Sequence, residues 1–352
     1  MPSEPDELRR STTRALSSLL DGPPAVALTT SCTHALEAAG LLLGVGPGDE
    51  VVVPAFTLSS TANAFLLRGA TLRFADVDPA TGNIDPDSVA ERTTDRTTVV
   101  VAVHYAGVAA DLPALLEQSR TRGWDLVEDA AQGLFGSLDG RALGRWGRLG
   151  AISFHRTKNV SCGEGGALVV NDPELITPAD VALDKGNDRV AFDAGVVAAY
   201  QWTGLGSAWR MPIETIERLA VSLDGAAERQ RRRHVIWDRY LEGLTDWAQA
   251  TGSTLPTIPD GAEHPAHIFW VLLPEGASRE AVREHCAARG VEVTQHYASL
   301  PTTTYGRTIA HPDDGCPVAE RFAARLIRLP LDPTMDDNDL NRVLAAVTTS
   351  TR

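Results

Sequence analysis

The sequence predicts an α/β protein with a large N-terminal domain, built on a mainly parallel sheet, and a smaller α+β C-terminal domain. Over the first two-thirds of the chain, short apolar runs rich in β-branched residues alternate with segments of helical spacing, as in parallel-sheet proteins. After about residue 245 proline and glycine become more frequent, which indicates a change of domain. With 352 residues, the chain is long enough for about two domains.

The strands predicted in the large domain are short and apolar, as buried parallel strands are. Between them lie segments with helical spacing, such as residues 35–43 and 112–122. The strands are expected at residues 50–53, 71–75, 98–103, 125–128, 151–154 and 167–170.

A long, charged helical pattern over residues 213–244 is expected to lead into the small domain. We therefore place the N-terminal segment and large domain at residues 1–225, and the bridging helix and small domain at 226–352. The small domain is expected to contain strands at 268–273 and 291–294, a helix near 279–289 and a closing helix after Asp336.

Composition excludes several classes of partner. A formal charge of -14 argues against nucleic acid, because such binders need a positive surface. The polar, acidic N-terminus lacks the features of a signal peptide, and no apolar stretch is long enough to span a bilayer, so we expect a cytoplasmic protein.

The four cysteines show no CxxC pairing, which favours free thiols over a disulfide framework or a metal site.

Lysine is scarce in this chain. Among 32 lysines and arginines only Lys158 and Lys185 are lysines. A coding bias can replace lysine by arginine wherever only a positive charge is needed. Lysine then remains where a guanidinium cannot perform the chemistry, and forming an imine is such a case. A chance survivor is the alternative.

Residues 30–36, TSCTHAL, place small hydroxyl-bearing residues directly before a helical pattern. The free amides at a helix start bind phosphate without any lysine. An ordinary Ser/Thr cap explains the same residues, so both interpretations stay open from this segment alone.

The acidic pair Glu128 and Asp129 stands at the carboxyl end of a predicted strand, the edge where open parallel sheets bind ligands. A carboxylate aimed into that cleft could keep a pyridine nitrogen protonated, so that the ring withdraws electrons from a substrate carbon. The alternative is that both acids cap the next helix in solvent.

Lys158 follows the strand at 151–154 on a turn, before a glycine-flanked Glu164. A lysine held beside an aldehyde cofactor forms a Schiff base and later moves a proton, whereas an exposed one is only a solvated charge. The chain thus contains, in this order, a helix start that could bind phosphate, an acid that could pair with a ring nitrogen, and a lysine that could form a Schiff base. Each lies beside a strand end. Together they indicate this type of site far more specifically than any one of them alone.

These segments resemble the DegT/DnrJ/EryC1/StrS family of sugar-nucleotide aminotransferases, which have the aspartate aminotransferase fold. The resemblance covers nearly the whole chain and is greatest to the branch that aminates C4 of dTDP-4-keto-6-deoxy-D-glucose. The matching segments are SCTHAL (31–36), GDEVVVPAFT (48–57), HYAG (104–107), EDAAQ (128–132), SFHRTKN (153–159) and EGGAL (164–168).

The resemblance implies pyridoxal 5'-phosphate as cofactor. Lys158 corresponds to the residue that forms the Schiff base and transfers protons, and Asp129 to the partner of the pyridine nitrogen. Gln132 corresponds to a residue near the ring hydroxyl. The cofactor phosphate is expected to contact Cys32, Thr33 and Ser153.

The resemblance also implies an obligate homodimer in which residues 204–210 reach the neighbouring active site, with Arg210 at the partner's cofactor phosphate. L-Glutamate is the expected amino donor and a dTDP-sugar the acceptor. His104, Tyr105 and His155 lie in matched segments and are assigned to the substrate.

Two positions depart from the family pattern. Leu58 stands where many relatives place an aromatic ring against the cofactor; a leucine can pack there, or serve only as a core residue. Pro301 stands where a histidine is common, so one contact to cofactor or sugar is lost or supplied elsewhere.

Three other functions are weighed against this one. The first is an aminotransferase for another keto-sugar nucleotide, acting at C3 or on a GDP- or UDP-sugar. The second is a sugar dehydratase of the same fold, but such enzymes typically carry histidine in place of the lysine. The third is a regulatory protein without catalysis, which should have lost some of the residues retained here.

Overall fold

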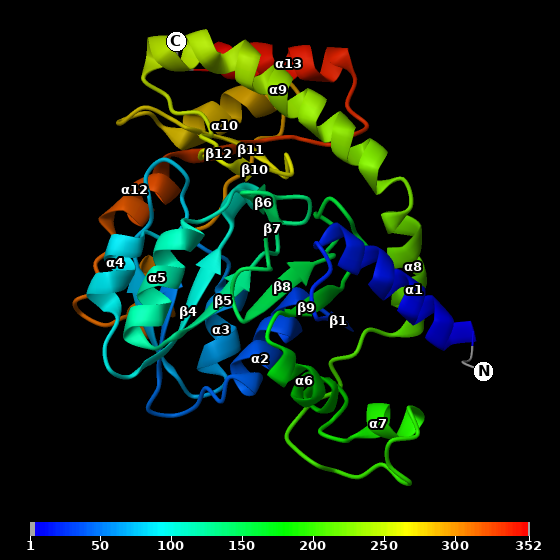
Figure 1. The fold of residues 1–352 in the computed structure, drawn as a ribbon. Coiled ribbons are helices and arrows are strands. Elements are labelled where there is room, and N and C mark those ends of the chain that lie inside the picture. Colours follow the sequence, from blue (N-terminus) through cyan, green and yellow to red (C-terminus); the bar gives the residue numbers. More distant parts are fainter. Residues whose placement is uncertain (1–3, 351–352) are drawn as a thin grey trace.

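The computed structural model describes residues 4–350 and contains a large lobe built on one sheet and a smaller C-terminal lobe beside it (Figure 1). The large sheet has the strand order β1-β9-β8-β5-β4-β2-β3. The pairs β2–β3, β2–β4, β4–β5 and β5–β8 are parallel, whereas β9 runs antiparallel to both β1 and β8. The predicted α/β class with a mainly parallel sheet is confirmed.

The strands of this sheet are nearly fully buried because helices cover both faces (Figure 1). All six predicted strands form, although the fifth begins and ends earlier than expected. The first strand, Ala25–Thr29, was not predicted; it pairs only with β9 at the sheet edge and is partly exposed. The seven strands are β1 Ala25–Thr29, β2 Glu50–Pro54, β3 Thr71–Ala75, β4 Thr97–Val103, β5 Asp125–Asp129, β8 Leu149–Ser153 and β9 Gly166–Val170.

Two apolar layers hold the helices on the sheet. One buries the α2, α3 and α6 side chains, with Phe65 and Leu183 among them, and the other buries those of α1, α5 and α8, with Leu16 and Leu219 among them. Burial of these side chains is the main favourable term in folding. The helices of the large lobe are α1 Glu4–Leu19, α2 Cys32–Leu42, α3 Ser59–Leu66, α4 Pro86–Arg92, α5 Leu112–Arg122, α6 Ile176–Leu183, α7 Arg189–Asp193 and α8 Ile213–Leu223.

The long helix predicted from residue 213 is in fact two helices, α8 and α9 (Ala226–Thr251). Gly225 has φ 69°, a left-handed conformation that glycine adopts without strain and that ends the first helix. In Figure 1, α9 runs from the large lobe to the far end of the small one. The division of the chain at residues 225 and 226 into two domains stays a prediction.

In the small lobe, α9, α10 (Arg279–Ala287) and α13 (Asp337–Thr348) pack on one face of a two-stranded sheet. That sheet pairs β11 (Phe269–Leu272) with β12 (Leu326–Leu329). The strand expected at residues 291–294 does not form, because Thr294 makes only an isolated bridge to Arg328. The remaining elements are short: β6 Ser137–Leu138, β7 Arg141–Ala142, β10 Ala262–Glu263, α11 Gly306–Ile309 and α12 Pro317–Arg325.

None of the helices within residues 4–350 is both long enough and apolar enough to cross a membrane.

Candidate active site

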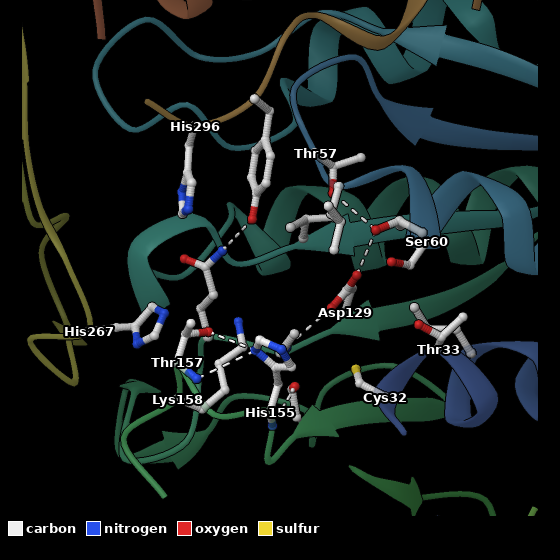
Figure 2. Close-up of a pocket in the computed structure, with 18 of the residues that line it drawn as sticks. Cys32, Thr33, Thr57, Ser60, Asp129, His155, Thr157, Lys158, His267 and His296 are labelled. Atoms are coloured by element: carbon white, nitrogen blue, oxygen red, sulfur yellow. Dashed lines mark hydrogen bonds between the residues drawn. The ribbon is translucent and has the colours of Figure 1, made fainter. Parts of the chain in front are cut away.

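A cavity of about 370 Å³ opens where the carboxyl ends of β4, β5 and β8 meet the small lobe (Figure 2). Parallel sheets bind ligands at this edge, where several strand ends bring side chains together. Both lobes line the cavity. From the large lobe come Cys32, Thr33, Leu36, Thr57, Leu58, Ser60, Thr61, Val103, Asp129, Ala131, Gln132, Ser153, His155, Thr157, Lys158 and Glu164, and from the small lobe come His267, His296, Tyr297 and Arg328.

Lys158 lies on a tight turn after β8 and extends toward the cavity (Figure 2). Its backbone amide donates to the carbonyl of His155 over 2.8 Å, and Arg156 and Gly163 hydrogen-bond across the same loop. Burial lowers the pKa of the Lys158 ammonium, and the positive charge of Arg328 lowers it further, while Asp129 acts in the opposite direction. A lower pKa leaves more of the amine neutral and nucleophilic at neutral pH.

The acids at the end of β5 point to opposite faces of the sheet, as neighbouring residues of a strand do. Asp129 lines the cavity. Glu128 is fully buried on the other face, where it accepts hydrogen bonds from the amides of Gly144, Trp146 and Gly147 at 2.5–2.7 Å. The expectation that one carboxylate faces the cleft therefore applies to Asp129, and Glu128 binds a loop.

Two neighbours hold the Asp129 carboxylate in place. The Thr61 hydroxyl donates to one oxygen over 2.7 Å, and the Ala131 amide donates to the other over 3.1 Å. Thr57 and Thr61 are 3.0 Å apart through their hydroxyls; since Thr61 gives its hydrogen to Asp129, Thr57 donates to Thr61. These hydrogen bonds fix the orientation of the carboxylate at the cavity wall.

Helix α2 begins at the cavity. The Ser31 hydroxyl accepts from the His34 amide over 3.1 Å, so the cap is real, yet Cys32 and Thr33 line the cavity beside it. A Cβ on Gly166 would lie 2.3 Å from the Cys32 nitrogen, so only glycine lets β9 pack this closely. The cap is therefore confirmed, and phosphate binding by the first amides of α2 stays a prediction.

Gln132 connects the lobes at the cavity wall. Its side-chain oxygen accepts from the Ala106 amide over 2.9 Å, and its nitrogen donates to the Tyr297 hydroxyl over 3.1 Å. The His296 ring stacks on Tyr297 with centroids 4.4 Å apart and planes 7° from parallel.

Sequence reasoning missed several cavity residues, including Thr61, His267, His296, Tyr297 and Arg328. His296 and Tyr297 precede the Pro301 departure in the segment QHYASLPTT, and Arg328 starts RLPL. Which of these side chains faces inward depends on how the small lobe docks.

The assignment of His104 and Tyr105 to the substrate needs correction, because the structure does not bring either side chain to the cavity. Both side chains are fully buried. The Ala110 amide donates to His104 Nδ1 over 3.2 Å, so Nε2 carries the hydrogen that goes to Glu128 at 3.0 Å. Tyr105 packs edge-on against Phe56, with ring centroids 5.0 Å apart. Both side chains lie behind the site and do not line the cavity.

The remaining predicted residues lie as follows. Ser153 and His155 line the cavity, and the His155 amide donates to the Ser153 hydroxyl over 3.3 Å. Leu58 also lines it and is 51% exposed, which excludes the alternative of a plain core leucine. Arg210 lines a separate cavity, with Asp180 3.4 Å away, so its action on a partner's cofactor stays a prediction.

In this cavity Lys158, whose pKa is lowered, lies together with the carboxylate of Asp129 and the start of α2. Pyridoxal-phosphate enzymes of the aspartate aminotransferase fold use this arrangement. The chain belongs to the DegT/DnrJ/EryC1/StrS aminotransferase family, whose model matches residues 12–348. Aminotransferases of this family depend on pyridoxal phosphate, which confirms the predicted cofactor and the predicted class of enzyme, a sugar aminotransferase.

Relatives match over most of their length. The spore coat polysaccharide biosynthesis protein SpsC of Bacillus subtilis is 32% identical over 333 residues, which are 90% of this chain and 83% of the relative. The dTDP-4-dehydro-2,3,6-trideoxy-D-glucose 4-aminotransferase of Saccharopolyspora spinosa is 31% identical over 91% of this chain and 83% of its own length. The crystal structure of the aminotransferase TlmJ from Streptoalloteichus hindustanus superposes with a TM-score of 0.87 at 32% identity, covering 99% of this chain and 96% of that one.

The cavity fits the cofactor. It offers a partly buried amine for its aldehyde, an acidic side chain held by two donors for its ring nitrogen, and a helix start with hydroxyls for its phosphate.

Proposed function

We propose that the chain transfers the amino group of L-glutamate to C4 of dTDP-4-keto-6-deoxy-D-glucose, giving a dTDP-4-amino-4,6-dideoxyhexose. The observation that carries the proposal is the cavity in which Lys158 and Asp129 lie together with the start of α2. Similarity to a dTDP-4-dehydro-sugar 4-aminotransferase supports the nucleotide and the carbon.

In this proposal the cofactor, when bound, carries the amino group between the two substrates and draws electrons from the reacting carbon. Lys158 moves the proton at the reacting carbon in both halves of the reaction. Its lowered pKa favours this role, because a neutral amine can accept a proton. Asp129 pairs with the ring nitrogen, and the hydrogen bonds from Thr61 and Ala131 hold its carboxylate in position for this. Cys32, Thr33 and Ser153 hold the phosphate, and Gln132 and Leu58 border the ring.

Burial raises the pKa of the Cys32 thiol well above its usual value. Cys32 is therefore neutral at the phosphate and contributes its backbone amide, not a charge that would repel the anion.

His155 is assigned to the sugar. Its ring lies beside Thr157, with Nδ1 3.0 Å from that hydroxyl, and Nε2 lies 3.9 Å from Glu164. These partly exposed polar groups form the outer part of the cavity, where a sugar carrying hydroxyl groups would need donors and acceptors.

The test is to incubate purified enzyme with pyridoxal phosphate, L-glutamate and dTDP-4-keto-6-deoxy-D-glucose, and to determine the product and its C4 configuration by NMR. A glutamate-dependent C4 amine is expected. A 3-deoxy product without nitrogen would instead identify a dehydratase, and amination only of a 3-keto, GDP- or UDP-sugar would identify another member of the family.

We also propose that the active enzyme is a homodimer. The segment after α7 exposes several large apolar side chains, with Trp202 80% exposed, and α7 projects away from the lobes (Figure 1). Exposed apolar groups gathered on one segment favour burial against a partner. Light scattering after gel filtration should give the mass of a dimer, and Trp202→Asp should shift it toward the monomer.

A further inference from the structure

Asn159, which directly follows Lys158, makes hydrogen bonds through its side chain to two distant parts of the fold. Its side-chain nitrogen donates to the carbonyl of Pro265 over 2.8 Å and to Oε1 of Gln230, on α9, over 3.0 Å. Its side-chain oxygen lies 2.8 Å from Nδ1 of His267. One amide group therefore ties the turn that carries Lys158 to the helix between the lobes and to the segment before β11.

These contacts determine which nitrogen of the His267 ring carries the hydrogen. A backbone carbonyl can only accept, so the end of the Asn159 amide that meets Pro265 must be the nitrogen. The other end is then the oxygen, which also only accepts, and Nδ1 of His267 must donate to it. Burial lowers the pKa of His267 well below its usual value, so the ring is neutral and holds no second proton. Nε2 of His267 therefore keeps its lone pair.

The backbone around His267 is held in an unusual conformation. Ala266 has φ 45°, a left-handed value that costs free energy in a residue with a Cβ and persists where surrounding contacts enforce it. Arg233, on α9, supplies such contacts, because its guanidinium donates to the carbonyls of Ala266 and His267. Gln230 donates to the preceding carbonyl, that of Pro265, over 2.6 Å. Strain of this kind gathers at functional sites, and here it fixes the backbone from which the His267 ring extends.

His267 and Lys158 both line the active cavity (Figure 2). They also share a smaller void of about 10 Å³, which Gln132 and Ser153 border as well. That volume is close to the space of one water molecule, and polar groups surround it. Within residues 4–350 no side chain or amide donates directly to Nε2 of His267. A bridging water in the void is therefore the partner that the geometry allows.

We propose that His267 is a positioning residue for the Lys158 amine and acts through one water bound in this void. The water accepts a hydrogen bond from the Lys158 ammonium and donates one to Nε2 of His267. This bridge orients the free amine and stabilises its protonated form, which offsets part of the effect of burial. The inference rests on the proposed function, since it takes Lys158 to be the reacting amine.

The charged and titratable groups that act on Lys158 lie on other elements than His267. Cys32 on α2 and Asp129 on β5 raise the pKa of the amine, and Arg328 on β12 lowers it. Variants of His267 leave all three side chains in place. A change in the pKa of Lys158 in such a variant can therefore be assigned to the lost acceptor.

The first experiment measures the pKa of Lys158 by acetylating the full-length, cofactor-free protein with acetic anhydride at a series of pH values, read by peptide mass spectrometry. Only Lys158 and Lys185 are lysines, so the exposed Lys185 is an internal reference. His267→Asn keeps a donor at the place of Nδ1 but has nothing at Nε2, and should lower the Lys158 midpoint by about one pH unit. His267→Gln reaches the place of Nε2 and should stay within about 0.3 unit of wild type.

The second experiment observes the tautomer by NMR of the protein labelled with nitrogen-15 in its histidines. The wild type should carry the His267 proton on Nδ1 at neutral pH, and the signal is identified by its loss in His267→Gln. Asn159→Ala removes the acceptor at Nδ1, so the proton should distribute over both nitrogens. The Lys158 midpoint should then fall by about half a pH unit.

His311→Gln, at an exposed histidine, is the matched control and should leave the Lys158 midpoint unchanged. An unchanged midpoint in His267→Asn, an equal shift in His267→Gln, or a proton on Nε2 in the wild type would each overturn the inference. Thermal melting shows whether each variant folds. If the His267 variants do not, Asn159→Ala serves for both the midpoint and the identification of the signal. No substrate enters these measurements, so a failure to aminate any sugar counts against the proposed acceptor alone.

Discussion

At the scale of single residues, Lys158 is the residue that we propose forms the Schiff base, and Lys185 is the control within the same chain. Lys158→Arg should reduce turnover to background, because a guanidinium does not form a Schiff base. The cofactor absorbance typical of covalent attachment should vanish with it. Lys185 is exposed and pairs only with Asp184 at 2.6 Å among described residues, so Lys185→Arg should retain both activity and spectrum. Normal turnover by the first variant would end the assignment.

The neighbouring acids on β5 allow a second residue-level prediction. Asp129→Asn keeps the shape but removes the charge, and should lower kcat by about 100-fold or more while the protein stays folded. Glu128→Gln lies on the other face, where the carboxylate binds three amides and His104. It should cost about 2 kcal/mol or more of unfolding free energy.

Urea unfolding and steady-state kinetics on both variants check this pair. The prediction fails if Asp129→Asn loses only stability, or if Glu128→Gln lowers kcat without lowering the unfolding free energy.

At the scale of secondary structure elements, the contact between β9 and α2 positions the start of α2, where we propose that the cofactor phosphate binds. A methyl group at Gly166 would meet the Cys32 nitrogen at 2.3 Å, and backbone atoms cannot move as a flexible side chain can. Gly166→Ala should therefore push the strand and helix apart, at a cost of about 1–3 kcal/mol, and weaken cofactor affinity.

Thermal melting and fluorescence titration of the apoenzyme with pyridoxal phosphate measure the two effects. Gly315 has open space around it and no positive φ, so Gly315→Ala is the control and should leave both quantities unchanged. Equal behaviour of the two variants would mean that the close approach at Gly166 does not matter.

At the scale of the whole molecule, buried histidines make stability depend on pH. Burial lowers the pKa of His264 to about 4, that of His296 to about 2, and that of His267 well below its usual value of 6.5. The unfolded chain therefore binds protons below about pH 6.5 that the folded chain does not, and stability falls as pH decreases. Each such histidine should cost roughly 2 kcal/mol between pH 7 and pH 5.

Urea unfolding at the two pH values tests this slope. His264 packs against Trp237, with ring centroids 4.3 Å apart, and does not line the active cavity. His264→Gln should reduce the difference between pH 7 and pH 5 by about one histidine's share. A stability that rises toward pH 5 would contradict the prediction.

The whole molecule also shows which features local sequence cannot reveal. The strand expected at residues 291–294 has the right residues, but no neighbour pairs along its length, since only Thr294 meets β12. The helix that was expected to be continuous is broken at Gly225. A helical sequence pattern does not predict the left-handed φ of this glycine. The edge strand β1 was missed because its pairing partner, β9, lies about 140 residues further along the chain.

The sequence by itself determined the α/β class, six of the seven strands of the large sheet, and the positions of Asp129 and Lys158 at or just after strand ends. Hydrophobic periodicity is local, and motif spacing fixes which residues follow a strand end. Only the tertiary structure decided that His104 and Tyr105 face the interior, and that His296, Tyr297 and Arg328 complete the cavity. The physical reason is that docking of the small lobe on the sheet edge, a long-range packing event, selects which side chains reach the site.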